Sequence, residues 1–298
     1  MRWHVSTPSP PYPLWQRMLM LDHNLISQQT ARLWMGLDEG ATDLAGPKNA
    51  RTRDDGFRYY DWRGQPLISV TSIRQVLGSP IGLTMWAQGQ IVDKAVDNID
   101  ELVQRAGVDP VDAKKWLRRA ATEARDAAGQ RGTAVHEMAE SGIPSTHPDV
   151  DPVLRPWLEQ YEEALASEGI APLLRECQVF STTLGYAGSF DLIATRQGEV
   201  TLIDLKTSKG TYIDHALQLM GYAVADFVGK DDVIDEDATK VLNRVSAMGI
   251  LHVQETSWEY VPIPKPSFPA LKAAWVAEAT LAKFLQQTPD IPALSKYV

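Results

Sequence analysis

The chain has 298 residues, of which 44% are hydrophobic and 22% are charged, so its composition is that of a globular protein and argues against a mainly disordered chain. The 29 basic and 38 acidic residues give a formal net charge of −9. This charge excludes a protein that coats nucleic acid or an anionic membrane by bulk attraction, but it leaves room for a local basic groove. The length allows one large domain or two small ones.

Cysteine usage limits the covalent chemistry. Cys177 is the only cysteine, which excludes an internal disulfide, a four-cysteine iron–sulfur cluster and a cysteine-built zinc site. A reducing compartment is therefore expected. No apolar run reaches the roughly 18–20 residues of a membrane span, and prolines among the first residues would break a helical transit peptide. We expect a soluble, cytoplasmic protein without a cleaved signal.

Residues 1–56 are predicted to form an N-terminal extension. A proline-rich start precedes a helix expected within Leu14–Leu37, and the Gly-, Asp- and Arg-rich stretch Asp38–Gly56 is expected to be a linker or loop. Strands are predicted next at Arg58–Trp62 and Pro66–Val70, joined as a hairpin by an Arg-Gly turn.

Helices are expected to dominate the following part of the chain. Thr71 and Ser72 can cap a helix that runs through Leu77. Longer helices are expected at Leu83–Ala106, at Pro110–Ala128, from about Gly132 onward, and at Pro152–Glu168 with Gly169 as the C-terminal stop.

After Gly169 the apolar pattern becomes strand-like. Strands are expected at Glu176–Thr182, Ser189–Thr195 and Glu199–Lys206, before a helix at Thr211–Phe227 with a capping box of Thr211 and Asp214. The remaining elements are an acidic loop at Lys230–Lys240, strands at Arg244–Val253 and Ser257–Ile263, and a helix at Phe268–Gln287.

The connections between these elements predict the fold class. Tight turns require the first three strands to be antiparallel neighbours, and a helical crossover allows the fourth strand to lie parallel. We therefore predict an α/β fold, with a mainly helical region at 57–130 and the strand-rich part at 131–298.

Two acids and a lysine lie on strands that are predicted to form a hairpin. Asp191 lies within one strand, whereas Asp204 and Lys206 share a face at the end of the next, with Leu205 on the opposite face. A hairpin can bring the two carboxylates side by side, which is costly unless a cation neutralises them. Oxygen ligands favour Mg²⁺ or Mn²⁺. Alone, an Asp-x-Lys pair is more typical of a solvated strand edge.

Other polar residues have equally ordinary interpretations when taken alone. His136 lies early in a predicted helix, and a lone helical histidine is more often structural than a metal ligand. Gln218 and Tyr222 lie four residues apart on a predicted helix and so share a face, as an ordinary half-buried pair does. The acidic loop at Lys230–Lys240 is expected to be solvated rather than to bind a metal.

The ordered set of these residues resembles a known family. The segments Gly132–His136, Gly188–Asp191, Asp204–Lys206 and Gln218–Tyr222 resemble the RecB-type branch of the PD-(D/E)XK nucleases. The resemblance covers about residues 132–253 and implies a restriction-endonuclease-like core, placed with a C-terminal helix at 131–298. A weaker likeness, around the sequence Ser-Val-Thr-Ser-Ile at 69–73, is to the front part of phage-encoded RecB-like exonucleases. The family's named proline is replaced here by phenylalanine.

The resemblance implies a role for each matching position. The implied metal ligands are His136, Asp191, Asp204 and the backbone carbonyl of Leu205. Lys206 would be the catalytic lysine, and Gln218 and Tyr222 would position the scissile strand or that lysine. Glu176 stands where some relatives have an extra acid, which would serve a second metal or support the first, but a surface or strand-capping role fits it equally.

The implied function is a Mg²⁺- or Mn²⁺-dependent DNA exonuclease of phage recombination or DNA end processing, without an iron–sulfur cluster. Host cytoplasm would then be its location, and a single-strand-annealing protein a partner. The P-loop pattern is missing, so no ATP site in cis is expected. The alternatives are an endonuclease or resolvase on the same core and a catalytically silent nucleic-acid-binding module. The complete set of acids, lysine and histidine argues against the module.

One segment could bring DNA to an acidic protein. Residues 113–131 hold four more basic than acidic residues, and several of them share a helix face. Such a face can contact phosphates or simply be solvated. The candidate DNA contacts are Lys114, Lys115, Arg118, Arg119, Arg125 and Arg131.

Overall fold

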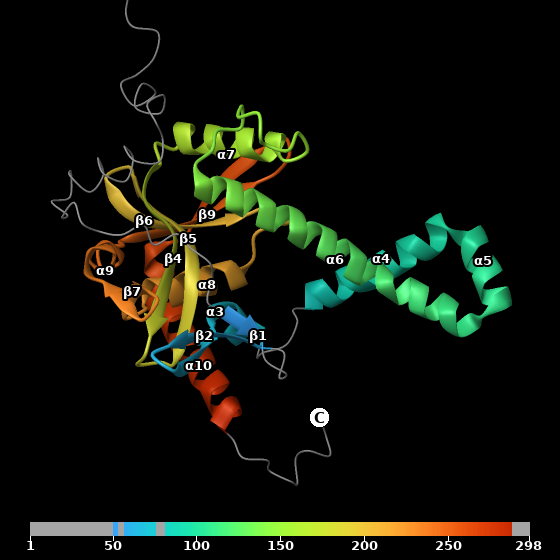
Figure 1. Cartoon of the computed structure of the whole chain (residues 1–298), viewed down its shortest axis with the longest axis horizontal. Helices are drawn as coiled ribbons and strands as arrows, with labels where there is room; N and C mark the ends of the chain where they lie inside the picture. Colours follow the sequence, from blue (N-terminus) through green and yellow to red (C-terminus); the bar gives the residue numbers. More distant parts are fainter. Residues whose placement is uncertain (1–49, 53–56, 76–80, 288–298) are drawn as a thin grey trace, which may run out of the picture.

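A computed structural model describes residues 50–52, 57–75 and 81–287, which form a mixed α/β fold around one mixed sheet (Figure 1). The strands are β1 (Ala50–Thr52), β2 (Arg58–Trp62), β3 (Gln65–Ser69), β4 (Ala171–Ser181), β5 (Tyr186–Arg196), β6 (Glu199–Lys206), β7 (Phe227–Lys230), β8 (Val233–Asp235), β9 (Ala247–Val253) and β10 (Trp258–Pro262). The helices are α3 (Val70–Gln75), α4 (Ile81–Asp97), α5 (Ile99–Val108), α6 (Pro110–Ser141), α7 (Arg155–Ser167), α8 (Ile213–Ala223), α9 (Glu236–Leu242) and α10 (Phe268–Gln287), with a short 3₁₀ turn η1 (Lys265–Ser267). The helix expected within Leu14–Leu37 lies outside the described residues.

The centre of the sheet has the strand order β9–β6–β5–β4. Strand β5 runs antiparallel to both β4 and β6, and β6 runs parallel to β9, so the predicted strand directions are confirmed. The crossover from β6 to β9 passes through α8, which is the kind of connection that parallel neighbours need. Strand β10 extends the sheet beyond β9, and the hairpin of β7 and β8 extends it beyond β4.

One edge of β5 is shared by two strands, and the sheet forks there. At the start of β5, Tyr186 and Ala187 pair with β3, whereas Leu192–Arg196 at its end pair with β6. The four residues between these pairings, 188–191, face the opening of the fork. The hairpin of β2 and β3 lies on the other arm of the fork, together with β1, which forms inside the stretch predicted to be a loop.

Helices cover both faces of the sheet (Figure 1). Apolar residues of α8 and α10 pack on one face, and those of α7 and of the C-terminal part of α6 pack on the other. Arg74 of α3 forms ion pairs with Asp214 of α8 and Glu278 of α10. These pairs connect α3 to the layer formed by α8 and α10.

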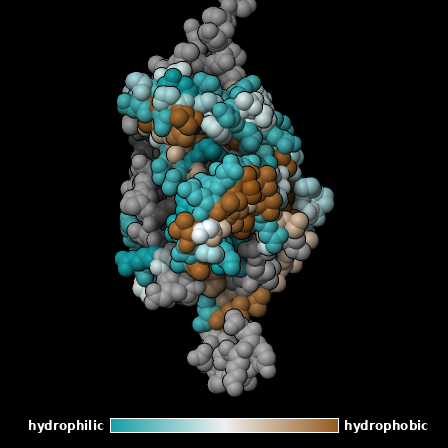
Figure 2. Space-filling model, turned by 90° about the vertical axis from the view of Figure 1, so that its right-hand side faces the viewer, coloured by the Kyte–Doolittle hydropathy of each residue, from teal (hydrophilic) through white to brown (hydrophobic). Residues whose placement is uncertain are grey.

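Helices α4 and α5 and the first part of α6, residues 81–128, form an arm that projects from this body (Figure 1). Among its described side chains, only Ala113 and Ala120 are buried. Figure 2 looks onto the end of the arm and shows apolar atoms gathered beside hydrophilic ones. The large exposed apolar residues of the arm are Met85, Val92, Val96, Ile99, Val103, Val108 and Val111. No helix in the described parts of the chain is long and apolar enough to cross a bilayer.

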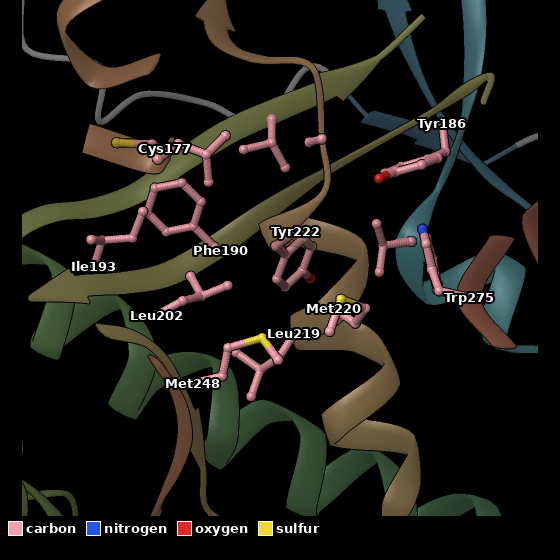
Figure 3. Packing of buried hydrophobic residues seen from close by; sticks show 14 of the residues in the cluster. Cys177, Tyr186, Phe190, Ile193, Leu202, Leu219, Met220, Tyr222, Met248 and Trp275 are labelled. Carbon is pink, nitrogen blue, oxygen red and sulfur yellow. The ribbon is translucent and has the colours of Figure 1, made fainter. Parts of the chain in front are cut away.

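The largest core cluster lies between the sheet and α8 (Figure 3). The ring of Tyr222 stands in this cluster near Phe190 of β5. Further along, Tyr186 packs edge-on against Trp275, and its hydroxyl donates a 2.6 Å hydrogen bond to the carbonyl of Gly221. Three elements, β5, α8 and α10, are therefore joined around one glycine.

Several predicted boundaries are wrong, for local reasons. Helix α3 begins at Val70, earlier than a cap at Thr71 or Ser72 would place it, because the hydroxyl of Ser69 accepts the backbone N–H of Ser72. The helix predicted at Leu83–Ala106 is interrupted at Asn98. Conversely, the two helices predicted on either side of residue 130 are one continuous helix, α6, so that boundary falls inside a helix.

Other helix ends follow the usual capping rules. Asp109 begins α6 by accepting the backbone N–H groups of Val111 and Asp112. Gly169 ends α7 as predicted: it has a positive φ of 62°, and the next N–H, of Ile170, returns to the carbonyl of Leu165 at 2.9 Å. The capping box predicted for Thr211 and Asp214 is not the one formed, since α8 begins after Tyr212.

The segment predicted to be an acidic loop is ordered instead. Asp231 and Asp232 form the turn between β7 and β8 with positive φ angles, which Asp tolerates better than most residues. Asp235 then caps α9 by accepting the N–H of Ala238 at 2.8 Å. Three of the acids in this segment thus serve a turn or a helix cap, and Asp237 pairs with Lys240 at 2.8 Å.

The packing around Gly221 can be tested by a single methyl group. A Cβ at this position would lie 2.6 Å from Trp275, so Gly221→Ala should lower the free energy of unfolding by about 1–3 kcal/mol through overpacking. Gly129→Ala in α6 is the matched control, because no atom lies within 4 Å of its Cβ. That variant should gain about 0.5–1 kcal/mol, since alanine favours the helix. Urea unfolding followed by far-UV circular dichroism measures both, and equal effects would contradict the packing.

Candidate functional site

Three carboxylates occupy neighbouring positions across three strands. The ladder of β4 and β5 pairs Arg175 with Leu192 and Cys177 with Phe190, which places Glu176 across from Asp191. The ladder of β5 and β6 ends at the pair of Leu192 and Ile203, so that Asp204 is the next residue across from Asp191. Like charges at opposed positions destabilise a sheet. This arrangement therefore needs cations nearby.

The strands are irregular at these acids. Phe190 packs in the cluster on the α8 side and Leu192 in the cluster on the α6 side, although regular alternation would place both on one face. The reversal occurs at Asp191. Across the ladder, Glu176 has a φ of 45°, which is uncommon for a residue with a side chain. The local twist turns both carboxylates out of the regular pleat and toward the fork.

His136 supplies the first cationic group. Its Nδ1 lies 3.4 Å from Asp191 Oδ1 and 3.9 Å from Glu176 Oε1. Val135 and Ala139, on the same helix, are buried against the sheet, which holds the imidazole at this point. Burial acts to lower the pKa of His136, but Asp191 and Glu176 raise it to about 10. The imidazole and two acids thus stabilise one another's charges.

Lys206 supplies the second cationic group. Its Nζ lies 2.7 Å from Asp204 Oδ2, which confirms that both side chains project to the same face of β6. Asp204 is only 1% exposed, and neither of its oxygens accepts a well-directed hydrogen bond from any described residue. Burial raises the pKa of Asp204 to about 6 in spite of the lysine. Among the described residues, Lys206 is thus the one ion-pair partner of this buried carboxylate.

Leu205 joins Asp191 to β6 where the ladder ends. Its backbone N–H donates a 2.7 Å hydrogen bond to Asp191 Oδ2. Burial opposes the charge of Asp191, but His136, Lys206 and this N–H together hold the pKa of the carboxyl below its usual range. In a β-strand, the N–H and the C=O of one residue point toward the same neighbouring strand. The carbonyl of Leu205 therefore also faces the fork.

Two glycines allow helices to approach the site closely. A Cβ on Gly188 would lie 2.6 Å from the ring of Tyr222, so only glycine lets this ring lie against β5. Gln218 donates a 2.8 Å hydrogen bond to the hydroxyl of Tyr222, which confirms that the two side chains meet on one face of α8. On α6, a Cβ on Gly132 would lie 3.2 Å from the hydroxyl of Thr207, just after β6.

The fork opens into a cleft of about 710 Å³. The predicted residues that line it are His136, Glu176, Asp191, Lys206, Gln218 and Tyr222. Asp204 is not among them, because it lies beneath Lys206 in the protein interior.

The far wall of the cleft was not predicted. Arg58, Tyr60, Ser69 and Thr71, from β2, β3 and the start of α3, line it opposite the acids. The hydroxyls of Ser69 and Thr71 lie 2.9 Å apart. The weaker likeness around residues 69–73 was the only sequence signal for this wall, and it gave no roles to these side chains.

Three residues at the fork lie close enough together to hold a metal ion. One atom each from His136, Glu176 and Asp191 lie within 4.8 Å of one another. A small void of about 20 Å³, enough for roughly one water, borders these three side chains and Leu205. Carboxylate and carbonyl oxygens favour Mg²⁺ or Mn²⁺, whereas imidazole is more typical of ions such as Zn²⁺ or Fe²⁺. Glu176, for which a surface or strand-capping role was an equal alternative, is thus central to this group. Asp204 lies outside it.

The predicted basic residues lie along α6 at different distances from the fork. A rise of about 1.5 Å per residue places Arg119 about 26 Å and Lys114 about 33 Å from His136 along the helix. Lys114, Lys115, Arg118 and Arg119 are exposed and form no ion pair with another described residue. Arg125 pairs with Asp126 at 3.2 Å, and Arg131 lies 5.4 Å from the ring of Trp157. The four basic residues at 114–119, which form no ion pair with a described residue, therefore lie on the arm.

No protein-family model matches this chain, and none of the curated proteins searched matches it either.

Metal binding tests the group at the fork directly. Asp191→Asn removes one charged ligand while it keeps the size of the side chain, and should weaken Mn²⁺ binding by about tenfold or more, as loss of metal-site residues does. Isothermal titration calorimetry of the purified protein measures this without any activity assay. Asp149→Asn, which removes a well-exposed carboxylate elsewhere, should leave the affinity unchanged. Equal Mn²⁺ affinity in wild type and Asp191→Asn would refute the site.

Proposed function

We propose that this chain is a metal-dependent DNA exonuclease. The observation that carries the proposal is the group of acids at the fork, Glu176, Asp191 and Asp204, with Lys206 beside them and an open cleft in front. Hydrolysis of a phosphodiester needs stabilisation of negative charge and an oriented water, and this group offers both a cation site and an ammonium.

The arrangement of the elements supports the same proposal. We propose that α7, β4, β5, β6, α8 and β9 are a restriction-endonuclease-like core, since the three antiparallel strands, the crossover helix and the parallel fourth strand occur in the order that this core requires. The resemblance of the ordered motifs to the RecB-type nucleases favours this core over other α/β folds with the same strand directions.

In the proposed enzyme, His136 in its neutral form, Glu176 and Asp191 would hold Mg²⁺ or Mn²⁺, with the Leu205 carbonyl and Asp204 adjacent. A bound divalent cation would polarise a phosphate oxygen and make a bound water more acidic. Asp191 has a second task, because its Oδ2 is tied to the N–H of Leu205 and keeps the ends of β5 and β6 in register.

Lys206 is the proposed catalytic lysine. Asp204 fixes its ammonium at 2.7 Å and helps to raise its pKa, so that it stays charged within the cleft. A fixed ammonium can orient the attacking water and stabilise charge on the phosphate. The hydrogen-bonded pair of Gln218 and Tyr222 lines the same cleft and would position the DNA strand.

The arm is proposed to bring DNA to this acidic protein. Its exposed basic residues at 114–119 lie about 26–33 Å from His136 along α6, far enough to touch DNA about 8–10 base pairs away from the cleavage point. Exonuclease action, phage recombination and an annealing-protein partner rest on the resemblance. Cleavage of covalently closed circular DNA would instead favour an endonuclease or resolvase.

Loss of the lysine tests the chemistry. Lys206→Ala should lower the rate of hydrolysis of end-labelled linear DNA by about 100- to 1,000-fold in Mg²⁺ or Mn²⁺, as loss of a group that stabilises the transition state does. Lys272→Ala, at an exposed position of α10, should cleave at the wild-type rate. A chelator should stop both. Undiminished cleavage by a folded Lys206→Ala protein would contradict the proposal.

Charge reversal on the arm tests DNA contact. The double variant Arg118→Glu/Arg119→Glu should bind linear DNA more weakly, and the slope of log affinity against log salt should decrease in magnitude by about 2. Lys272→Glu introduces an acid away from the arm and serves as the control. Fluorescence anisotropy at several salt concentrations gives the slopes. If the double variant and wild type have the same slope, these arginines do not contact phosphates.

A further inference from the structure

The loop that follows Lys206 is held rigidly although it is exposed. Gln254 Nε2 donates to the carbonyl of Ser208 at 2.8 Å and to that of Thr207 at 3.3 Å, and His252 Nε2 lies 2.6 Å from the same Ser208 carbonyl. The Ser208 hydroxyl donates to the carbonyl of Gly210 at 2.9 Å. His252 of β9 and Gln254, just after it, therefore anchor the loop between β6 and α8.

This loop presents an aromatic ring and a lysine to solvent. Tyr212 is 60% exposed, and Lys209 is exposed three residues before it. The ring of Tyr212 stands edge-on to that of His215, with centroids 5.6 Å apart and planes at 72°. The backbone N–H of Tyr212 also donates to His215 Nδ1 at 3.3 Å. The ring is thus held between His215 and Gly210, and more than half of the residue stays accessible to a ligand.

Tyr212 continues the row of α8 side chains that lines the cleft. His215, Gln218 and Tyr222 follow one another at intervals of three and four residues, which keeps them on one side of the helix. Tyr212 precedes the helix as its N-cap residue and joins this row through the contact of its ring with His215. Gln218 and Tyr222 lie in the cleft, together with Lys206. The exposed tyrosine therefore lies at the outer end of a line that leads to the proposed catalytic lysine.

We propose that Tyr212 is a stacking position for a nucleobase of single-stranded DNA at the edge of the cleft, with Lys209 beside it for a phosphate. This proposal rests on the proposed nuclease function. An aromatic ring beside a cation is the usual combination for binding single strands, and stacking accepts every base. A base in a duplex hides both its faces in the stack, so the position selects an unpaired strand.

The test is binding of a fluorescein-labelled oligothymidylate of about 20 nucleotides, longer than most single-strand sites, in Ca²⁺ so that a hard cation is present. Tyr212→Ala should weaken binding about tenfold, and Tyr212→Trp should retain it. Ile213→Ala is the matched control, because this adjacent apolar side chain is 67% exposed and should be dispensable. A blunt duplex of equal length should bind wild type and Tyr212→Ala alike.

A second measurement locates the contact. A single abasic nucleotide, moved along the oligonucleotide, should weaken binding to wild type at one position and binding to Tyr212→Ala at none. Equal affinity of wild type and Tyr212→Ala for the single strand, or an equal loss with Ile213→Ala, overturns the stacking position. If wild type cleaves linear DNA, only the stacking position has failed. If wild type neither binds the single strand nor cleaves DNA, both proposals have failed.

Discussion

The placement of Glu176, Asp191 and Asp204 across three adjacent strands is the constraint on which the rest of this structure depends. Opposed carboxylates repel, and each is buried or nearly so, so the fold must bring positive charge to them. Helix α6 brings His136 from one face of the sheet, and β6 itself supplies Lys206. The forked edge of β5 then leaves Glu176 and Asp191 open to the cleft, whereas Asp204 stays buried beneath Lys206.

The part of the site that lies within regular strands could be predicted. Period-two alternation places Asp204 and Lys206 together, and the turn between β5 and β6 sets the register that brings Asp191 across from Asp204. Glu176 was harder to assign. Its contact with His136 depends on a left-handed backbone conformation, and the sequence gives no sign that a glutamate adopts one here. The wall from β2 and β3 depends on a parallel pairing of residues more than a hundred positions apart.

Helix and loop boundaries were predicted less well than strand directions. Gly129 and Gly132 suggested an interruption, yet α6 passes through both, since helices tolerate isolated glycines and one of these allows Thr207 to approach. The acids near residue 235 suggested a solvated loop, but the same residue types make turns and helix caps. In each case the local composition allowed two structures, and contacts made by distant parts of the chain decided between them.

The continuity of α6 has a mechanical consequence. The helix that carries the exposed cations of the arm is the same one that carries His136, and no break or proline interrupts it between them. The arm is therefore joined, without a break in the helix, to the imidazole that lies beside Asp191 and Glu176. If α6 tilts as one rigid body, the imidazole of His136 moves together with the cations of the arm.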